Sequence, residues 1–257
     1  MAAIIHAVSS TDAETAEWQL RQDMAAVFRV SARLGWNEQI GNHNSIMLPR
    51  ARPDDEPLFL FNPRGCLFQE LTASSLIVCN LDGTVVRGTG ELRKAAFFIH
   101  ARIHLQSPAA TCLLHVHPQY LTALSLLEHP RMELAHHNNL LLNDRIAIDN
   151  TAEAPADSHA EGDRLAQARG DKSLLITNGH GVTVAGPTVY DACDELYIAE
   201  RTAMYQVTAL STGQKLRALP DHARRNWHGP WGEKVDARLH LDAWRRILDE
   251  AEPDYAK

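Results

Sequence analysis

Residues 111–117 read Thr-Cys-Leu-Leu-His-Val-His, an apolar run that ends in two histidines. A short apolar run of this kind is typical of a buried β-strand. Side chains two residues apart in a strand point to the same face of its sheet, so His115 and His117 are expected to lie together where the strand ends. Two imidazoles in this arrangement can bind one metal ion.

The chain contains 14 histidines, and a third one stands where it can join this pair. His180 lies in a turn, residues 177–181, directly after the apolar segment 174–176, and glycines on both sides of it permit a close approach of the backbone. Three neutral imidazoles with one open position are typical of a catalytic zinc site. We therefore predict one divalent metal ion per chain on His115, His117 and His180. Zn²⁺ is the first expectation, with Mn²⁺, Fe²⁺ or Co²⁺ as alternatives.

The composition favours a folded protein that acts on small molecules. The chain has 257 residues, of which 45% are apolar, enough for a substantial core. It carries 25 lysines and arginines against 32 aspartates and glutamates, a net charge of −7 at pH 7. This acidic balance argues against nonspecific binding to nucleic acid or anionic membranes. We expect a small-molecule substrate, no nucleic-acid or membrane partner, and association with further copies of the chain.

The cysteines and the amino-terminal segment indicate where the protein works. Cys66, Cys79, Cys112 and Cys193 stand singly, without C-x-x-C pairs, as expected for reduced thiols. Residues 1–14 lack the basic and apolar regions of a signal peptide, and no apolar run approaches the ~18 residues needed to span a bilayer. We expect a cytoplasmic protein.

The hydrophobic spacing predicts an α/β fold. Helices are expected from about residue 11 to Gly35, over 93–106, over 120–127 and from Pro187 to about Leu210, and strands around 44–47, 58–61, 75–79, 111–116, 173–177 and 182–185. Residues 149–162 lack such spacing and indicate a surface loop. We assign residues 1–213 to one domain and 214–257 to a C-terminal extension. Its aromatic residues Trp227, Trp231 and Trp244 favour packing against another subunit.

A series of short motifs resembles the class II aldolase/adducin family in order and spacing, from about residue 15 to 212. These motifs are Gly35–Glu38, Gly41–Ser45, Phe61–Gly65, Leu71–Ser74, Leu81–Gly83, Ile99–His104, His115–His117 and Asn178–Gly181. The resemblance implies a three-layer αβα sandwich around a mostly antiparallel sheet. It also implies a homotetramer, or else a dimer, and a divalent metal on the histidines that match His115, His117 and His180.

The sequence departs from the family's aldolases at a position that matters for their chemistry. Those enzymes carry a glutamate for proton transfer four residues before the histidine that matches His100, whereas this chain has Ala96. A Ser-Ser pair that helps to hold phosphate in sugar-phosphate members is here Lys94-Ala95. We therefore expect a substrate other than a sugar phosphate. The helix resembles that of an adducin-like bacterial subgroup.

Two residues are candidates for the missing acid–base group. Tyr120 follows His117 by three residues, although a tyrosine near a strand end also serves in packing. His137 falls near the position where the family's aldolases use a tyrosine from the adjoining subunit. The sequence leaves both possibilities open.

Four polar residues are candidates for contacts with the substrate. Asn42, His43 and Asn44 form a polar loop that can bind substrate oxygens, or whose amides can instead bond their own backbone. Arg64 can bind a carboxylate through two parallel hydrogen bonds. His100 and His104 are expected to pack and hydrogen-bond behind the site.

These observations predict a metal-dependent carbon–carbon lyase of the retro-aldol type, acting on a small hydroxy-carbonyl or hydroxy-acid substrate. A hydroxy-acid decarboxylase is the nearest alternative, since it needs the same electron sink but no base for a substrate alcohol. A non-haem iron oxygenase is a second alternative, because three histidines do not distinguish iron from zinc. An adducin-like binding or scaffold protein without catalysis is the third.

Overall fold

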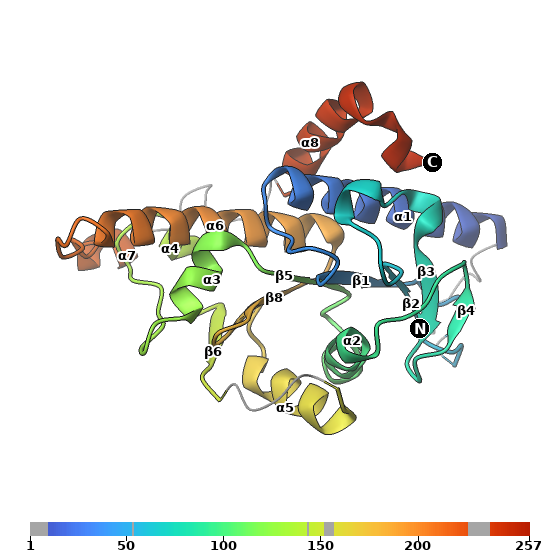
Figure 1. Cartoon of the computed structure of the whole chain (residues 1–257), viewed down its shortest axis with the longest axis horizontal. Coiled ribbons are helices and arrows are strands. Elements are labelled where there is room, and N and C mark those ends of the chain that lie inside the picture. The colour runs from blue at the N-terminus through green and yellow to red at the C-terminus, as the bar shows by residue number, and fades with distance from the viewer. Residues whose placement is uncertain (1–9, 53, 143, 152–156, 226–236) are drawn as a thin grey trace, which may run out of the picture.

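A central sheet of eight strands organises the molecule, a computed structural model that describes residues 10–52, 54–142, 144–151, 157–225 and 237–257 (Figure 1). The strands lie in the order β4-β3-β2-β1-β5-β8-β7-β6. Neighbouring strands are antiparallel except β6 and β7, which run parallel. The strands are β1 (His43–Met47), β2 (Leu58–Phe61), β3 (Ile77–Asn80), β4 (Val85–Arg87), β5 (Cys112–Val116), β6 (Ile146–Asp149), β7 (Leu174–Thr177) and β8 (Gly181–Gly186).

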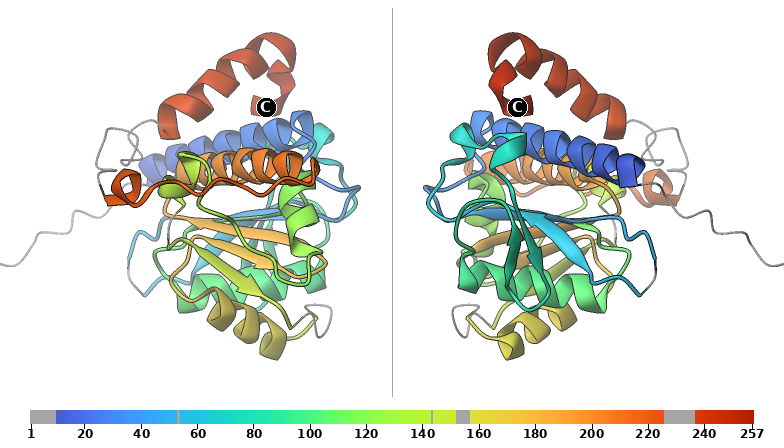
Figure 2. Two further views of the ribbon diagram at one scale, coloured as in Figure 1. Left: turned by 90° about the vertical axis from the view of Figure 1, so that its left-hand side faces the viewer. Right: turned by 90° about the vertical axis from the view of Figure 1, so that its right-hand side faces the viewer.

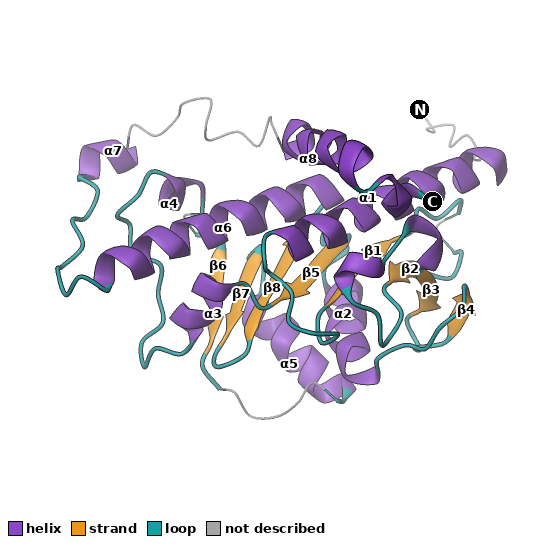
Figure 3. Cartoon of the chain, turned by 45° about the horizontal axis from the view of Figure 1, so that its top comes forward, coloured by secondary structure: helices purple, strands orange, loops and turns teal. Residues whose placement is uncertain are grey.

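Helices cover both faces of this sheet. In Figure 1, α1 and α6 lie along one face and α2 and α5 along the other, and the side views of Figure 2 show the same layers. Figure 3 shows α1 and α6 side by side across the strands. The helices are α1 (Ser10–Arg33), α2 (Lys94–Gln106), α3 (Gln119–Ser125), α4 (Asn138–Leu141), α5 (His159–Arg169), α6 (Val189–Leu210), α7 (Asp221–Arg225) and α8 (Ala237–Ala251). The predicted αβα sandwich around a mostly antiparallel sheet is confirmed.

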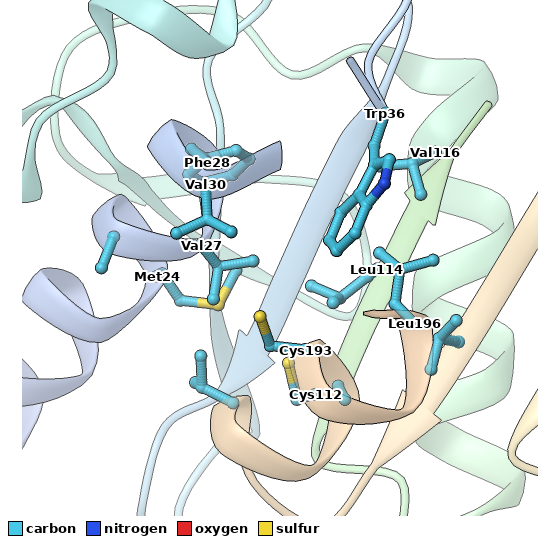
Figure 4. Packing of buried hydrophobic residues seen from close by; sticks show 14 of the residues in the cluster. Met24, Val27, Phe28, Val30, Trp36, Cys112, Leu114, Val116, Cys193 and Leu196 are labelled. Carbon is cyan, nitrogen blue, oxygen red and sulfur yellow. The ribbon is translucent and has the colours of Figure 1, made fainter. Parts of the chain in front are cut away.

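The strand β5 separates two layers of core because its side chains alternate between the faces of the sheet. Leu114 and Val116 join the main hydrophobic core beneath α1 and α6, part of which is drawn in Figure 4. Leu113 belongs to a second apolar cluster, which includes residues of α2 and α5. His115 and His117 have the same parity as Leu113, so both lie on the α2 side.

Segment 149–162, predicted to be a surface loop, contains regular structure at both ends. The strand β6 ends at Asp149 and α5 already begins at His159, while residues 152–156 lie outside the described part. Ser158 caps α5, because its Oγ accepts a hydrogen bond from the N–H of Glu161 at 3.2 Å. The prediction was wrong for residues 159–162, since the cap begins a helix whose short apolar face gives little periodic signal.

The helix α5 lies close against α2 because residue 162 is glycine. A Cβ at Gly162 would lie 2.5 Å from the carbonyl oxygen of Phe98 and 2.7 Å from Cγ of Arg102. Arg102 Nε also donates to Asp163 Oδ1 at 2.5 Å. These contacts hold α2 and α5 closely together on one face of the sheet.

The C-terminal segment packs on its own chain. The helix α8 contacts α1 and α6, and Leu241, Leu248 and Tyr255 are at most 1% exposed within the main core. Arg29 of α1 binds Glu252 at 3.0 Å. This segment is therefore part of the same hydrophobic core as the sheet.

The aromatic residues of the predicted extension have different positions. Trp244 is partly buried against the main core. Trp227 and Trp231 lie outside the described residues. Contact of this segment with another subunit stays a prediction.

The helices show no feature of a membrane span. Among the residues that the structure describes, no helix combines the length and the apolar character needed to cross a bilayer.

Replacing Leu248 tests the role of the C-terminal segment. Because the side chain is fully buried, Leu248→Ala should lower the free energy of unfolding by about 2–5 kcal/mol through lost burial and a new cavity. Leu239→Ala is the matched control, since Leu239 on the same helix is 64% exposed and its loss should cost less than about 0.5 kcal/mol. Urea unfolding followed by circular dichroism measures both, and equal effects would contradict the packing described.

Candidate metal centre

Three imidazoles converge where β5 ends beside the β7–β8 turn. One ligand nitrogen of each of His115, His117 and His180 lies within 4.8 Å of the other two. The ring of His180 is centred 4.8 Å from that of His117 and 4.9 Å from that of His115. His115 is buried, His117 is half-buried and His180 is exposed, so the group opens to solvent. The structure thus brings the three predicted metal ligands together, and we call them the triad.

Two side chains outside the triad orient its rings. His117 Nδ1–H donates to Glu38 Oε2 at 2.7 Å, and because a carboxylate only accepts, the lone pair of the neutral ring is on Nε2. His115 Nδ1 lies 3.1 Å from Thr183 Oγ1. A carboxylate partner fixes the tautomer of a metal-binding imidazole, and both partners hold the direction of their ring.

The triad has the chemistry that a divalent cation needs. His117 Nε2 is buried and has no hydrogen-bond partner in the described part of the chain. Burial and the neighbouring imidazoles hold the pKa of His115 well below its usual value, and the same causes lower the pKa of His180. Both rings are therefore neutral at pH 7 and free to donate lone pairs. A cation on the triad would also satisfy the unpartnered nitrogen.

The chain leaving α1 places Glu38 beside the triad. Gly35 takes a φ of +69° after the helix, and the buried Trp36 follows. The carbonyl of Trp36 accepts from the N–H of His117 at 2.9 Å. Asn42 Oδ1 accepts from the N–H of Glu38 at 2.5 Å. These bonds tie residues 36–42 to the end of β5.

The β7–β8 turn brings His180 close because of its glycines. Gly179 has a φ of +65°, which other residues seldom adopt. A Cβ at Gly181 would clash with the ring of His117 and would lie 2.8 Å from the carbonyl oxygen of Val116. The turn can therefore approach β5 only with glycine at position 181.

The predicted substrate contacts at residues 42–44 face different ways. The ring of His43 stacks on that of His115, with centroids 4.5 Å apart and planes 13° apart. Asn44 Oδ1 instead accepts from the N–H of His115 at 3.2 Å, and Asn42 holds Glu38. The two amides support the backbone of the site, while His43 lies against the triad.

A cavity of about 1070 Å³ borders the loop that leads into β1, because Gln39, Ile40 and Gly41 line it, whereas the triad histidines do not. Its lining includes the cationic side chains of Arg64, Arg93 and Lys94. Arg64, a predicted substrate contact, forms an exposed ion pair with Glu91 at 3.7 Å. Arg93 donates to the carbonyl of Gly41 at 3.2 Å, and its charge adds to the effect of burial in lowering the pKa of both His43 and His180. Arg93 is thus the cation that links the cavity to the triad.

One family of known proteins matches most of the chain. The family described as "Class II Aldolase and Adducin N-terminal domain" matches residues 22–207. The chain belongs to the class II aldolase and adducin family.

Relatives match almost the whole chain. The "Putative aldolase class 2 protein" of Caulobacter vibrioides is 34% identical over 246 residues, which cover 94% of this chain and 93% of the relative. Human beta-adducin is 26% identical over 95% of this chain, which spans 35% of the adducin. A solved aldolase II superfamily protein from Pseudomonas syringae superposes with a TM-score of 0.85 at 29% identity and covers 100% of both chains.

The two predicted acid–base residues lie on or beside short helices that pack against α6. Tyr120 of α3 packs against the main core, and its N–H donates to the buried Glu200 at 2.8 Å. His137 precedes α4 next to His136, whose ring centre lies 4.9 Å from that of Tyr205. The catalytic roles of Tyr120 and His137 stay predictions.

The surroundings of position 96 are apolar. The aldolases of the class II aldolase and adducin family are expected to carry glutamate at this position. Ala96 is 1% exposed and belongs to a cluster with Phe59, Phe61 and Phe97. The missing carboxylate therefore leaves a packed aromatic surface instead of a polar gap.

The sequence did not single out Glu38, Thr183 or Arg93 as parts of the site. Glu38 ends one of the motifs of the family, which was a usable signal. Thr183 could be found only from the pairing of β5 with β8, which sets it opposite His115. Arg93 precedes α2 and reaches the site through the fold alone.

Weakening the support of His117 should weaken metal binding. Glu38→Gln removes the negative charge that holds the Nδ1–H tautomer, so zinc affinity should fall about 10- to 100-fold. Competition with a chromophoric chelator measures the affinity. Glu91→Gln is the control, because that carboxylate is exposed and pairs with Arg64. Equal affinities for the two variants would show that Glu38 does not support the site.

Proposed function

We propose that the protein is a divalent-metal-dependent carbon–carbon lyase that cleaves a small hydroxy-carbonyl or hydroxy-acid substrate by a retro-aldol reaction. The convergence of His115, His117 and His180 around an unpartnered ring nitrogen is the observation that carries this proposal. Membership of the class II aldolase and adducin family supports it. Zn²⁺ is the metal that we propose, because neutral imidazoles suit it and it needs no redox partner.

Each group around the triad has a part in this chemistry. When bound, a divalent cation supplies Lewis-acid stabilisation of the negative charge that develops on the substrate oxygen. In the cleavage itself the substrate hydroxyl passes its proton to the acid–base group, for which we propose His137, and becomes a carbonyl, while the electrons of the broken carbon–carbon bond pass to the other fragment as an enolate. The same group then returns the proton to the enolate carbon and releases the second product. Glu38 and Thr183 hold the imidazoles in direction throughout. Preorganised partners of this kind need not move during the reaction.

The cavity favours an anionic substrate. Arg64, Arg93 and Lys94 line it, with Asp82 and Glu91 as its carboxylates. A guanidinium binds a carboxylate through charge-assisted hydrogen bonds. Of these three cations, Arg93 is the one whose charge lowers the pKa of His180 of the triad. We therefore place the substrate carboxylate at Arg93 and its hydroxyl toward the triad.

Decarboxylation of a hydroxy acid is the second candidate. The apolar surroundings of Ala96 favour it, since that reaction needs the electron sink but no base for a substrate alcohol. An iron-dependent oxygenase would use the same three imidazoles. Human beta-adducin, a relative, makes a scaffold without catalysis the alternative from another class.

The proposal includes assembly into a homotetramer, or else a dimer. Leu126, Leu127 and Tyr205 are 67%, 45% and 41% exposed, apolar side chains at the end of α3 and on α6 that a second copy would cover. His137 lies near Tyr205 through its neighbour His136, whose ring contacts that of Tyr205. In such an assembly His137 would serve the triad of an adjoining copy.

A product assay separates these functions. Zinc-loaded protein is incubated with a panel of small hydroxy acids and hydroxy-carbonyl compounds, and aldehyde, carbon dioxide and oxygen are followed. We expect aldehyde release that falls to background in His117→Ala and in His137→Ala, the latter with its zinc retained. His222→Ala is the control, because His222 of α7 is exposed and belongs to neither the triad nor the lining of the cavity.

Each other outcome of that assay points to a named alternative. Carbon dioxide without aldehyde would replace the lyase with a decarboxylase. Oxygen consumption in iron-loaded protein would replace it with an oxygenase. If the protein binds no metal and none of the measured activities changes in His117→Ala, the scaffold without catalysis would be favoured.

Arg93 should determine the affinity for the substrate's carboxylate. Loss of a charge-assisted hydrogen bond costs about 1.5–3 kcal/mol, so Arg93→Gln should raise KM about 10- to 100-fold with little change in kcat. Arg131→Gln is the control, since Arg131 lies at the far end of α6 from this cavity. Steady-state kinetics on the best substrate of the panel decide, and an unchanged KM would remove Arg93 from the substrate site.

A further inference from the structure

Four buried polar side chains link β1 to α2 behind the triad. We call them the polar row; its members are His43, His100, Ser45 and His104, which are 5%, 0%, 0% and 5% exposed. His43 and Ser45 lie two residues apart on β1 and therefore share the face of the sheet that α2 covers. His100 and His104 lie one helical turn apart on α2.

The members of the polar row are joined end to end by hydrogen bonds. His43 Nδ1 lies 2.8 Å from His100 Nε2, and His100 Nδ1 lies 2.5 Å from Ser45 Oγ. Ser45 Oγ lies 2.7 Å from His104 Nε2. His104 Nδ1 ends the row at the carbonyl oxygen of Ala110, at 2.8 Å.

The last bond gives the row its direction. A carbonyl oxygen only accepts, so His104 carries its proton on Nδ1 and its Nε2 accepts from the hydroxyl of Ser45. Ser45 Oγ then accepts from Nδ1–H of His100, which leaves His100 Nε2 as an acceptor. That nitrogen accepts a hydrogen bond from Nδ1–H of His43.

The two imidazoles of α2 are neutral, as this assignment requires. Burial holds the pKa of His100 well below its usual value and lowers the pKa of His104 to about 4. A neutral imidazole has one N–H and one lone pair. His43 is 5% exposed and bonds through Nδ1–H to His100, and burial without a carboxylate partner favours its uncharged form, in which Nε2 carries the lone pair.

His43 holds this lone pair beside the triad. Its ring is stacked between Phe61 of β2, at 6.0 Å, and His115 of β5, at 4.5 Å. Since Nδ1 is turned to α2, Nε2 lies on the side of the ring away from that helix. Because His115 belongs to the triad, this lone pair lies next to the candidate metal ligands.

We propose that His43 offers Nε2 as a fixed hydrogen-bond acceptor for a hydroxyl group of the substrate beside the triad. The other three members of the polar row are positioning residues that fix its tautomer. This inference rests on the proposed function for the presence of a substrate at the triad. It assigns the specificity of the site, because a substrate that presents a hydroxyl here gains a bond that a deoxy or oxo analogue lacks.

The tautomer can be measured directly in the wild-type protein. Two-bond proton–nitrogen correlation spectra of protein labelled with ¹⁵N-histidine and loaded with diamagnetic Zn²⁺ separate protonated from bare ring nitrogens. We expect His43, His100 and His104 each to carry the proton on Nδ1, with His43→Gln used to assign the signals of residue 43. A proton fixed on Nε2 of His43 would overturn the inference without any variant.

Replacing Ser45 tests whether the row fixes the tautomer. In Ser45→Ala the link is cut, so His104 keeps its Nδ1–H on Ala110 while His100 and His43 become mixtures of tautomers. Ser45→Thr keeps the hydroxyl and should restore the wild-type pattern. A buried serine with a purely structural role would leave the tautomer of His43 unchanged in Ser45→Ala, and that result would refute the relay.

Ligand binding tests the specificity. Lactate and propionate differ in one hydroxyl, and their affinities for the zinc-loaded protein are measured by calorimetry. Loss of one net hydrogen bond should lower the preference for lactate about three- to tenfold in Ser45→Ala, with zinc affinity unchanged. A preference equal to that of the wild type would contradict the assignment.

The experiments distinguish failure of this inference from failure of the proposed function. If no carbon–carbon cleavage is found but the tautomers and the lactate preference are as expected, the acceptor role of His43 is supported and the proposed lyase activity is rejected. If cleavage is found but His43 carries its proton on Nε2, the lyase activity is supported and the acceptor role is rejected.

Discussion

The pairing of β5 with both of its neighbours is the constraint on which the site depends. In this register His43 of β1 and Thr183 of β8 lie on either side of His115. The three side chains therefore form one row across the sheet, on the face that α2 covers. A slip of one residue would turn each of them into the opposite core, because side chains alternate along a strand. Leu114 and Val116 precede and follow His115 along β5, and their burial under α1 and α6 opposes such a slip.

The sequence predicted the parts of the structure whose signals are local. Alternation around His115 and His117, and glycines around His180, were enough to suggest one metal site, and a series of motifs resembled the family. The three-layer fold followed from that resemblance. By contrast, α5 was missed in part because Ser158 caps a helix with little apolar face, and β6 because a parallel edge strand depends on its neighbour β7.

The partners of the supports of the site could not be predicted, for a different reason, although Glu38 itself ends one of the family motifs. Glu38 reaches His117 across a large separation in the chain, through a turn that Gly35 and Asn42 shape. Arg93 and Thr183 likewise act through the fold. The burial of Leu248 and Tyr255 in the core of their own chain likewise depends on contacts of α8 with distant helices. Spacing along a sequence identifies which side chains have suitable chemistry, whereas their partners depend on the tertiary structure.

Gly162 shows how far the packing around the site extends. It lies on α5, where the backbone of α2 leaves no space for a side chain. The two helices share one layer of the sandwich, and α2 carries His100 and His104. The absent Cβ therefore allows α5 to pack directly against the helix that bears half of the polar row. A residue with no functional group in this way belongs to the packing around hydrogen bonds that it does not touch.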